Sequence, residues 1–239
     1  MGKVLITGAT GFIGNHVTRL CLERGDEVRV MVMPREDRSP LQGMDVEIVE
    51  GNLLDPHSLS RAVQGVQQLY HLAALFAIWT KDPDLHFKIN VDGARYMMEL
   101  AKAAGVEKIV FTSSVAAIGI VGDGGWATEK TPFNGWPWAS EYILSKFISH
   151  QMVKGMVSDG LHHDVADGGG LHGAGSHREA GRVGEGLVEK IVAAAPADDV
   201  DAPHLLRRDL HQVIDDLGAP QGQRFENEAG KADRRARNP

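Results

Sequence analysis

The sequence contains little of several things that define common protein classes. Only one of its 239 residues is cysteine, which excludes an intrachain disulfide framework and a cysteine-rich metal site. We therefore expect a reducing, cytoplasmic setting. The formal net charge of -7 argues against a binder of nucleic acid or of anionic membranes, because contacts with phosphates need clustered Lys and Arg.

Long apolar runs are also missing. The longest ones have the length of a strand, so no segment is expected to span a membrane. The first residues lack the basic and then apolar order of a secretory signal, so we expect neither export nor anchoring. The length and the 43% hydrophobic content still suit one or two globular domains with a sizeable core.

The composition changes near residue 158. All eight Met and every aromatic residue except Phe225 precede this point, whereas residues 159–239 contain no Thr, Tyr, Trp or Met. We interpret residues 1–158 as a folded domain. Residues 159–239 are interpreted as an atypical tail that is partly helical or disordered.

Strand-like and helical patterns alternate through the first domain. Strands are predicted at residues 3–7, 27–33, 45–50, 68–75 and 108–114. Helices are predicted from residue 12 to Gly25, from Asp55-Pro56 onward, and from Asp82-Pro83 to about Ala104. Repeated units of this kind indicate an α/β fold, a Rossmann-like doubly wound parallel sheet with helices on both faces.

A glycine triplet, Gly8, Gly11 and Gly14, follows the first predicted strand. A chain that turns sharply, approaches a pyrophosphate and packs a helix against a strand needs residues without Cβ at such positions. The N-terminus of the next helix offers free N–H groups and a partial positive charge to phosphates. An ordinary glycine turn is the alternative, but the position between strand and helix predicts dinucleotide binding.

The end of the second predicted strand bears on the choice of dinucleotide. NAD sites place an acidic residue there for the ribose 2′-OH, and NADP sites place an Arg nearby. The sequence after the strand reads MPREDR at residues 33–38, with no acid at the tip and with Arg35 and Arg38 just beyond it. We expect NADP rather than NAD, with arginines in a solvated loop as the alternative.

The pair Tyr142 and Lys146 shares one face of a predicted helix, because the two residues are four positions apart. A neighbouring ammonium group favours the phenolate, which brings the tyrosine closer to working pH as a proton donor or acceptor. Proton transfer to a carbonyl oxygen is half of carbonyl reduction, and a nicotinamide hydride supplies the other half. The spacing alone is a weak signal, but its position after the fifth strand strengthens it.

Five segments in this order give the chain a family resemblance: TGATGFIG at 7–14, HLAA at 71–74, NVDG at 90–93, FTSS at 111–114 and YILSK at 142–146. The chain resembles an extended short-chain dehydrogenase/reductase of the epimerase/dehydratase and dihydroflavonol-reductase-like group. The resemblance covers about two thirds of the chain. It implies a Tyr142 acid/base, a Lys146 that lowers the tyrosine pKa and holds the nicotinamide ribose, and a Ser114 that bonds the reacting oxygen. Asn90 corresponds to a helix residue used in proton relay.

The glycine loop, the tip of the second strand and the resemblance together give a set of expected cofactor contacts. These are Gly8, Thr10, Gly11, Phe12, Ile13, Gly14, Arg35, Asn52, Leu53, Ala73, Ala74 and Lys146. Two positions depart from the family pattern. Asn52 stands where relatives carry an aspartate for the adenine, although an amide can still bond an adenine edge, and Met33 stands where reductase-like relatives often carry Arg.

Other conspicuous residues have plain alternatives. Cys21 is expected to be a buried packing thiol. The aromatic residues near the site are candidates for lining a substrate pocket and indicate an apolar or ring-containing substrate, with loop cover as the alternative; they are Phe76, Ile78, Trp79, Trp126, Trp136 and Trp138. We predict no metal site, because His162, His163, His172 and His177 lack the spacing of metal ligands.

The tail departs most from the resemblance. A relative would continue with an apolar sixth strand and a substrate-binding part, but residues 160–170 read GLHHDVADGGG, which we judge unable to form that strand. An uncovered sheet edge would follow. One hypothesis is an altered reading frame near residues 158–162, which sequencing the gene would test. A genuine divergent tail is the competing one.

These observations predict an NAD(P)-dependent oxidoreductase that transfers hydride between nicotinamide and a ketone or alcohol. A nucleotide-sugar epimerase or dehydratase with tightly held NAD is the first alternative. A catalytically inactive NAD(P)-binding protein is the second. The expected partner is a small-molecule substrate, and a homodimer is possible.

Overall fold

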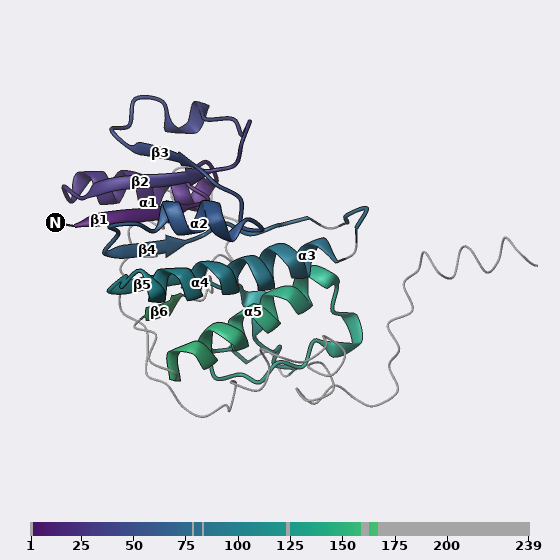
Figure 1. The fold of residues 1–239 in the computed structure, drawn as a ribbon. Helices are drawn as coiled ribbons and strands as arrows, with labels where there is room; N and C mark the ends of the chain where they lie inside the picture. The colour runs from purple at the N-terminus through teal and green to yellow at the C-terminus, as the bar shows by residue number, and fades with distance from the viewer. Residues whose placement is uncertain (1, 78, 83, 123–124, 159–162, 167–239) are drawn as a thin grey trace, which may run out of the picture.

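A computed structural model describes residues 2–77, 79–82, 84–122, 125–158 and 163–166. Within these ranges six parallel strands form one sheet in the order β3-β2-β1-β4-β5-β6, as Figure 1 shows. The strands are β1 Lys3–Thr7, β2 Glu27–Val32, β3 Glu47–Glu50, β4 Gln68–His71, β5 Lys108–Thr112 and β6 His163–Ala166. The helices are α1 Phe12–Glu23, α2 Pro56–Ala62, α3 Leu85–Phe87, α4 Ala94–Ala103 and α5 Glu141–Ser158. The predicted doubly wound α/β class is confirmed.

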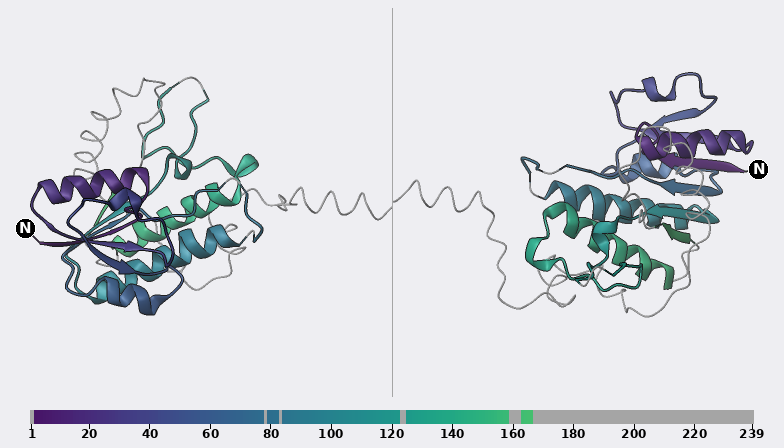
Figure 2. Two further views of the ribbon diagram at one scale, coloured as in Figure 1. Left: turned by 90° about the horizontal axis from the view of Figure 1, so that it is seen from above. Right: turned by 180° about the vertical axis from the view of Figure 1, so that it is seen from behind.

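The central strands are almost continuously apolar because helices cover both of their faces. Along β1, Val4 and Ile6 face one side and Leu5 faces the other, and all three are fully buried. Figure 2 shows α1 on one side of the sheet and α4 and α5 on the other. The sheet is therefore the middle of three layers.

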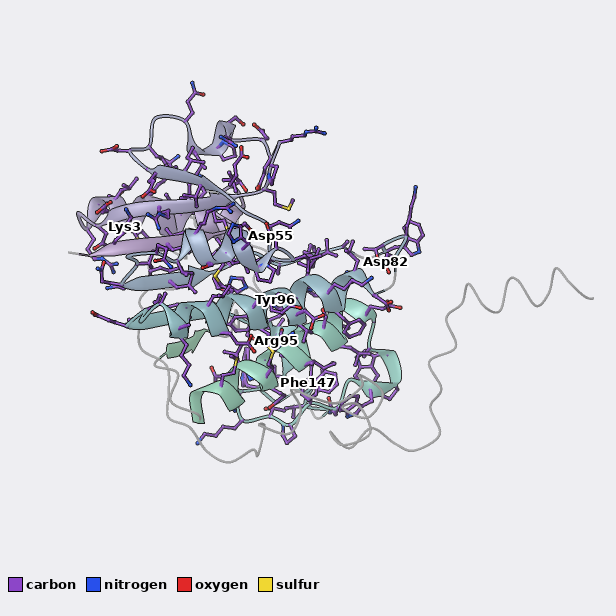
Figure 3. The ribbon with its side chains drawn as sticks, viewed as in Figure 1. Lys3, Asp55, Asp82, Arg95, Tyr96 and Phe147 are labelled. Atoms are coloured by element: carbon purple, nitrogen blue, oxygen red, sulfur yellow. The ribbon has the colours of Figure 1, made fainter. Side chains whose placement is uncertain are left out.

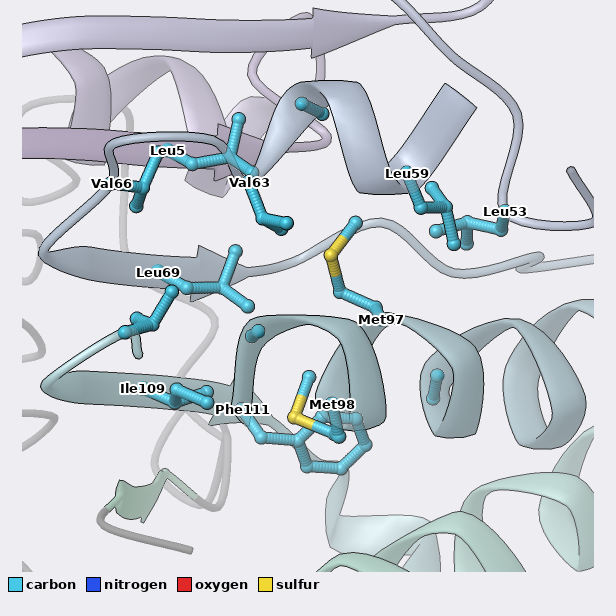
Figure 4. Close-up of a cluster of buried hydrophobic side chains, with 14 of the residues drawn as sticks. Leu5, Leu53, Leu59, Val63, Val66, Leu69, Met97, Met98, Ile109 and Phe111 are labelled. Carbon is cyan, nitrogen blue, oxygen red and sulfur yellow. The ribbon is translucent and has the colours of Figure 1, made fainter. Parts of the chain in front are cut away.

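The two layers of core differ in content. Beneath α1 most members of the cluster are β-branched, and several come from β2, including Val28, Val30 and Val32. On the other side longer side chains from α2, α4 and the strands interlock, as Figure 4 shows; labelled members are Leu59, Leu69, Met97, Met98, Ile109 and Phe111. Two strands at the middle of the sheet, β1 and β4, are thus anchored from both faces.

The prediction that residues 160–170 could not provide a sixth strand is wrong. The segment His163–Ala166 forms β6 and pairs in parallel with β5, with His163 opposite Ile109 and Ala166 opposite Thr112. Pairing at a sheet edge depends on backbone N–H and C=O groups, so a short edge strand needs little apolar content. The edge of β5 is covered, and the sheet extends beyond residue 158.

The single helix predicted from Asp82-Pro83 to Ala104 is also wrong in detail. Asp84 precedes α3, a π-helical turn η2 follows at Lys88–Gly93, and α4 completes the run. Gly105 ends it with a φ of +75°. Four strands are shorter than predicted: β2 ends at Val32, β3 begins at Glu47, β4 ends at His71 and β5 ends at Thr112.

Some expectations lie outside the described residues. These include Ile78, the side chains of the four tail histidines, and the question of a shifted reading frame. Within the described ranges no cluster of three or more His, Cys, Asp and Glu side chains could hold a metal ion. None of the helices described combines the length and apolar character needed to cross a lipid bilayer.

Candidate active site

The strand order places the candidate site between β1 and β4, where the direction in which the chain adds strands to the sheet reverses. The chain runs outward from β1 to β2 and β3, then returns to β4 on the other flank of β1. In open α/β sheets ligands bind beyond the carboxyl ends of the strands at such a point. Figure 3 shows Asp55 and Asp82, which lie in segments that follow β3 and β4, toward this same end of the sheet.

The glycine loop is shaped by backbone contacts that leave no space for side chains. A Cβ on Gly14 would lie 2.0 Å from the carbonyl oxygen of Gly8, and one on Gly8 would lie 2.9 Å from the backbone nitrogen of Ala73. Gly11 caps α1 without a side-chain hydrogen bond, so the first-turn N–H groups have no capping side chain. The loop therefore has the form of a pyrophosphate cradle at a helix N-terminus.

A buried hydrogen-bond network ties this loop to the end of β4. The Thr7 hydroxyl oxygen accepts hydrogen bonds from the backbone N–H groups of Leu72 and Ala73, at 3.2 and 3.1 Å. It also bonds Nδ1 of His71 at 2.9 Å, as the donor if both its lone pairs serve the backbone. Burial, together with the charge of Lys146, lowers the pKa of His71 to about 3. His71 is thus a neutral structural base at physiological pH.

The interpretation that no acid lies at the tip of β2 is wrong. The chain turns after β2, and the Glu36 carboxylate returns to accept the Met33 backbone N–H at 2.6 Å and the Thr10 hydroxyl. Arg38 is paired with Glu50 at the end of β3, while Arg35 is exposed. Sequence position alone favoured Arg35 and Arg38 as cofactor contacts, with a solvated loop as the alternative, because the turn that brings Glu36 back is not visible as a pattern.

Other predicted cofactor residues lie after β3 and at the start of α1. Asn52 and Leu53 follow β3, and the Asn52 amide oxygen accepts the Leu54 N–H at 2.9 Å, which constrains its side chain. Leu53 is buried, whereas the side chain of Phe12 is 69% exposed at the start of α1. These assignments stay predictions.

Lys146 is the most buried cation of the candidate site. It lies on α5 with 4% of its surface exposed, and its Nζ donates a hydrogen bond to the Thr112 carbonyl at the end of β5, at 3.1 Å. Burial lowers the pKa of Lys146 to about 8. The Nζ also lies 5.3 Å from the centre of the Phe111 ring, whose centre is 5.8 Å from that of the His71 ring.

Asn90 joins the segment after β4 to the helix that carries Tyr142. Its Nδ2 donates to the Leu75 carbonyl and to the Ser145 hydroxyl, and its Oδ1 accepts the Leu75 N–H. The Ser145 hydroxyl in turn donates to the Tyr142 carbonyl at 2.8 Å. Asn90 is 3% exposed. This placement makes it a positioning residue for α5, and its predicted role in proton relay stays a prediction.

The serine pair divides into a buried and a more accessible member. Ser113 is buried and bonded to Nδ1 of His150 on α5 at 2.8 Å. Ser114 is half-buried, and its hydroxyl oxygen accepts the Ala116 N–H at 3.2 Å. The hydroxyl proton of Ser114 has no part in that bond, so this serine is the better candidate for contact with a reacting oxygen.

Aromatic rings lie against Tyr142. The ring centre of Phe76 is 5.1 Å away in an edge arrangement, and that of buried His86 is 6.2 Å away. Phe76 and Trp79 are 78% and 75% exposed. Trp136 instead packs on Phe147, which Figure 3 labels on α5, and so belongs to the core.

Sequence reasoning missed three residues that shape the site: Glu36, His71 as a structural base, and His86. His86 donates from Nε2 to the Ala77 carbonyl at 3.0 Å, since a carbonyl can only accept. Its Nδ1 is buried without a partner among the described residues. The HLAA segment pointed to His71, but no pattern pointed to His86.

Three features together define a dinucleotide-binding protein of the short-chain dehydrogenase/reductase type. They are the reversal of strand order between β1 and β4, the glycine loop after β1, and helix α5 with Tyr142 and Lys146. A sequence model described as the NAD dependent epimerase/dehydratase family matches residues 4–211. The chain belongs to the NAD-dependent epimerase/dehydratase family.

Individual relatives agree with this assignment. The chain is 42% identical over 125 residues to a provisionally named dihydroflavonol 4-reductase of Synechocystis sp., covering 52% of this chain and 36% of that one. It is 37% identical over 149 residues to sterol demethylase protein B of Methylococcus capsulatus, covering 62% and 45%. UDP-glucose 4-epimerase of Thermus thermophilus, solved in complex with NAD, is 31% identical with a TM-score of 0.60, covering 68% and 53%. The chain spans less than half the length of these two curated relatives.

Proposed function

We propose that the chain carries out NAD(P)-dependent hydride transfer between nicotinamide and a ketone or alcohol, with Tyr142 as the acid/base. The observation that carries this proposal is that α5, which bears Tyr142 and Lys146, contacts the same carboxyl end of the sheet as the glycine loop. Lys146 is bonded to the end of β5, and β5 is separated from β1 by β4 alone. Adjacent strands lie about 4.8 Å apart, so one dinucleotide can span the two strand spacings between the ends of β1 and β5.

The residues at this edge fit a dinucleotide. The first turn of α1 and the glycine cradle would hold the pyrophosphate, and Lys146 would hold the nicotinamide ribose. When bound, the nicotinamide supplies or accepts the hydride. The predicted preference for NADP is supported by Arg35 alone, because Arg38 is paired with Glu50.

In the reducing direction the carbonyl carbon gains a hydride and the carbonyl oxygen gains the proton of the Tyr142 hydroxyl. The carbonyl π bond breaks, the carbonyl group becomes an alcohol, and the phenolate left on Tyr142 is reprotonated from solvent. The positive charge of Lys146 stabilises the phenolate. Ser114 bonds the reacting oxygen and orients it toward Tyr142.

The substrate class we propose is apolar or ring-containing. Phe76 contacts the Tyr142 ring directly and is largely exposed, and Trp79 is three residues further on. A carbonyl that reaches Tyr142 would therefore lie beside an aromatic surface. The relative named for sterol demethylation is consistent with such a substrate.

A nucleotide-sugar epimerase is the second candidate. It is favoured by the likeness to the UDP-glucose 4-epimerase that was solved with NAD. In such an enzyme the same Tyr and Lys serve a transient oxidation, and the cofactor stays bound. NAD that remains on the purified protein without net consumption of reduced cofactor would favour it.

The test uses purified protein with NADH or NADPH and a panel of cyclic, long-chain and sugar-linked ketones. We expect net oxidation of the reduced cofactor with apolar ketones, and a fall of about 100-fold or more in turnover for Tyr142→Phe. Tyr96→Phe, the same change on α4, is the matched control and should leave turnover unchanged. Cofactor binding with turnover at the background level in both wild type and Tyr142→Phe would instead favour the inactive, binding-only alternative.

Three coarser expectations accompany the proposal. We propose that residues 1–158 form the cofactor domain, to which β6 adds a strand from the following segment. We also propose a cytoplasmic setting and a homodimer. Limited proteolysis and analytical ultracentrifugation would test the first and the last.

A further inference from the structure

His86 is buried in the wall of the candidate site, and one of its ring nitrogens is unused. The side chain is 2% exposed, and its Nε2–H donates to the Ala77 carbonyl at 3.0 Å. In a neutral imidazole that carries its proton on Nε2, Nδ1 is an acceptor, and among the described residues this atom has no partner. A buried acceptor without a partner lowers stability, so stability alone does not explain a histidine at this position.

The bond to Ala77 is one of a set that holds a short segment after β4. Asn90 binds both the N–H and the carbonyl of Leu75. About one helical turn before Asn90, His86 binds the carbonyl of Ala77. Phe76 lies between the two anchored residues. Its backbone is therefore fixed from both sides, although its side chain is largely exposed.

This segment determines what lies beside Tyr142. The Phe76 ring meets the Tyr142 ring edge-on, with the ring centres 5.1 Å apart and the planes at 85°. The His86 ring lies against the same tyrosine, at 6.2 Å and 69°. Figure 1 shows α3, which carries His86, beside α5, which carries Tyr142. Phe76 can offer an apolar wall to a ketone at Tyr142 while its backbone stays in this place, and the bond from His86 holds it there.

We propose that His86 is a positioning residue for substrate selection. By holding the Ala77 carbonyl it keeps Phe76 against Tyr142, and so makes the site favour ring-containing ketones over small ones. The inference rests on the proposed function, and it assigns part of the specificity to a buried residue that acts through its neighbours. A leucine of similar volume would remove the orphaned Nδ1, but it would leave the Ala77 carbonyl without its donor.

Three replacements separate the hydrogen bond from the ring. His86→Gln keeps an N–H donor near the position of Nε2 without the ring, His86→Phe keeps a ring without the donor, and His86→Leu keeps neither. His57→Leu, at an exposed position of α2, is the matched control. Each full-length variant is assayed with NADH and NADPH on 2-acetonaphthone, a ring-containing ketone, and on acetone, which offers Phe76 little apolar surface. Circular dichroism melts show which variants are folded.

Loss of the donor should lower the preference for 2-acetonaphthone over acetone, measured as the ratio of the two kcat/KM values. We expect a fall of at least tenfold in His86→Leu and His86→Phe, through KM and with kcat within threefold of wild type, because Tyr142 is intact. His86→Gln and His57→Leu should stay within threefold of the wild-type ratio. Phe76→Ala should also lose the preference, and adding His86→Leu to it should change the ratio less than twofold, since both act through one ring.

A second readout does not depend on turnover. Chymotrypsin cleavage after Phe76, followed by mass spectrometry, should be at least fivefold faster in His86→Leu and His86→Phe than in wild type, because local release of the backbone exposes it to the protease. Cleavage after the exposed Trp126, on a different loop, should be unchanged and controls for general loosening.

A wild-type ratio in whichever of His86→Leu and His86→Phe is folded would overturn the inference. A ratio that is lost in His86→Gln and kept in His86→Phe would also overturn it, because the ring and not the bond would then matter. Losses that multiply in the double variant would overturn it by assigning the effect to general packing. Absence of turnover of both ketones by wild type would overturn the proposed function. The cleavage rates would then decide the inference, and equal rates after Phe76 would overturn it as well.

Discussion

The phosphate-binding loop and the Tyr-Lys helix are built by different means. In the loop, backbone meets backbone: Gly14 lies so close to Gly8 that no Cβ can be added. Around the helix, long-range side chains make the contacts, with Asn90 spanning to Leu75 and Ser145 and with Lys146 reaching Thr112. A site made of backbone contacts fails abruptly when an atom is added, whereas one made of side-chain bonds weakens by steps.

The sharpest test of this contrast is Gly14→Ala. The new Cβ would lie 2.0 Å from the Gly8 carbonyl oxygen, and neither backbone segment can yield without opening the loop. We expect complete loss of NADH binding, with destabilisation of about 3 kcal/mol or more. Calorimetric titration and urea unfolding measure the two effects.

The matched control is Gly122→Ala, since nothing lies within 4 Å of a Cβ there. It should bind and unfold as wild type does. Wild-type NADH affinity in Gly14→Ala would show that side chains, and not close backbone packing, shape the loop.

Buried His71, which is bonded beside the glycine loop, predicts that the protein loses stability in acid. The pKa of His71 is lowered from 6.5 to about 3, so between these pH values the unfolded chain binds a proton that the native protein does not. Stability is fully present above pH 6.5 and is lost as the pH falls, by up to about 5 kcal/mol. His71→Gln should remove this loss, as urea unfolding at several pH values would measure. His57→Gln, at an exposed helix position, controls for the substitution, and parallel curves for wild type and His71→Gln would refute the prediction.

Buried Lys146 on α5 predicts that stability also rises with pH in the alkaline range. The pKa of Lys146 is lowered from 10.5 to about 8, so between these values the unfolded chain again holds the extra proton. Stability therefore rises with pH across this window, by about 3 kcal/mol relative to Lys146→Met. Urea unfolding of both proteins at pH values across the window measures the difference. A constant difference would mean that Lys146 is solvated in the native protein.

The smallest expected effect compares two asparagines that each hold the N–H and carbonyl of one residue, although Asn90 has one further bond, to the Ser145 hydroxyl. Asn90 holds the N–H and carbonyl of Leu75 in a buried place, and Asn134 holds those of Ile120 in an exposed one. Asn90→Ala should cost about 2 kcal/mol and Asn134→Ala about 0.5 kcal/mol, because water replaces lost partners at the exposed position. Chemical denaturation of both variants provides the comparison. Equal costs would imply that neither burial nor the bond to Ser145 adds to the strength of the Asn90 network.

The same contrast explains what the sequence could predict. The glycine triplet could be recognised from the sequence because a local demand on the backbone leaves a local pattern. Tyr142 and Lys146 could be recognised because four residues make about one helical turn. The contact between Lys146 and Thr112 joins residues 34 positions apart, and no pattern encodes it. The return of Glu36 to Thr10 is equally non-local. The sixth strand was missed because pairing at an edge depends on backbone groups, which composition does not record.

The π-helical turn η2 has a consequence for chain alignment. Accommodating one extra residue in a turn shifts everything before it by about 100° around the axis relative to everything after it. Asn90 can therefore face Leu75 and α5, while Met97 and Met98 further along still point into the core. The π-helical turn therefore rotates the side chains of α4 about the helix axis relative to those that precede it. Deleting a single residue from 88–93 would remove this rotation, so that either Asn90 or the two methionines would no longer point toward their present partners. The same deletion in an exposed loop would cost little stability.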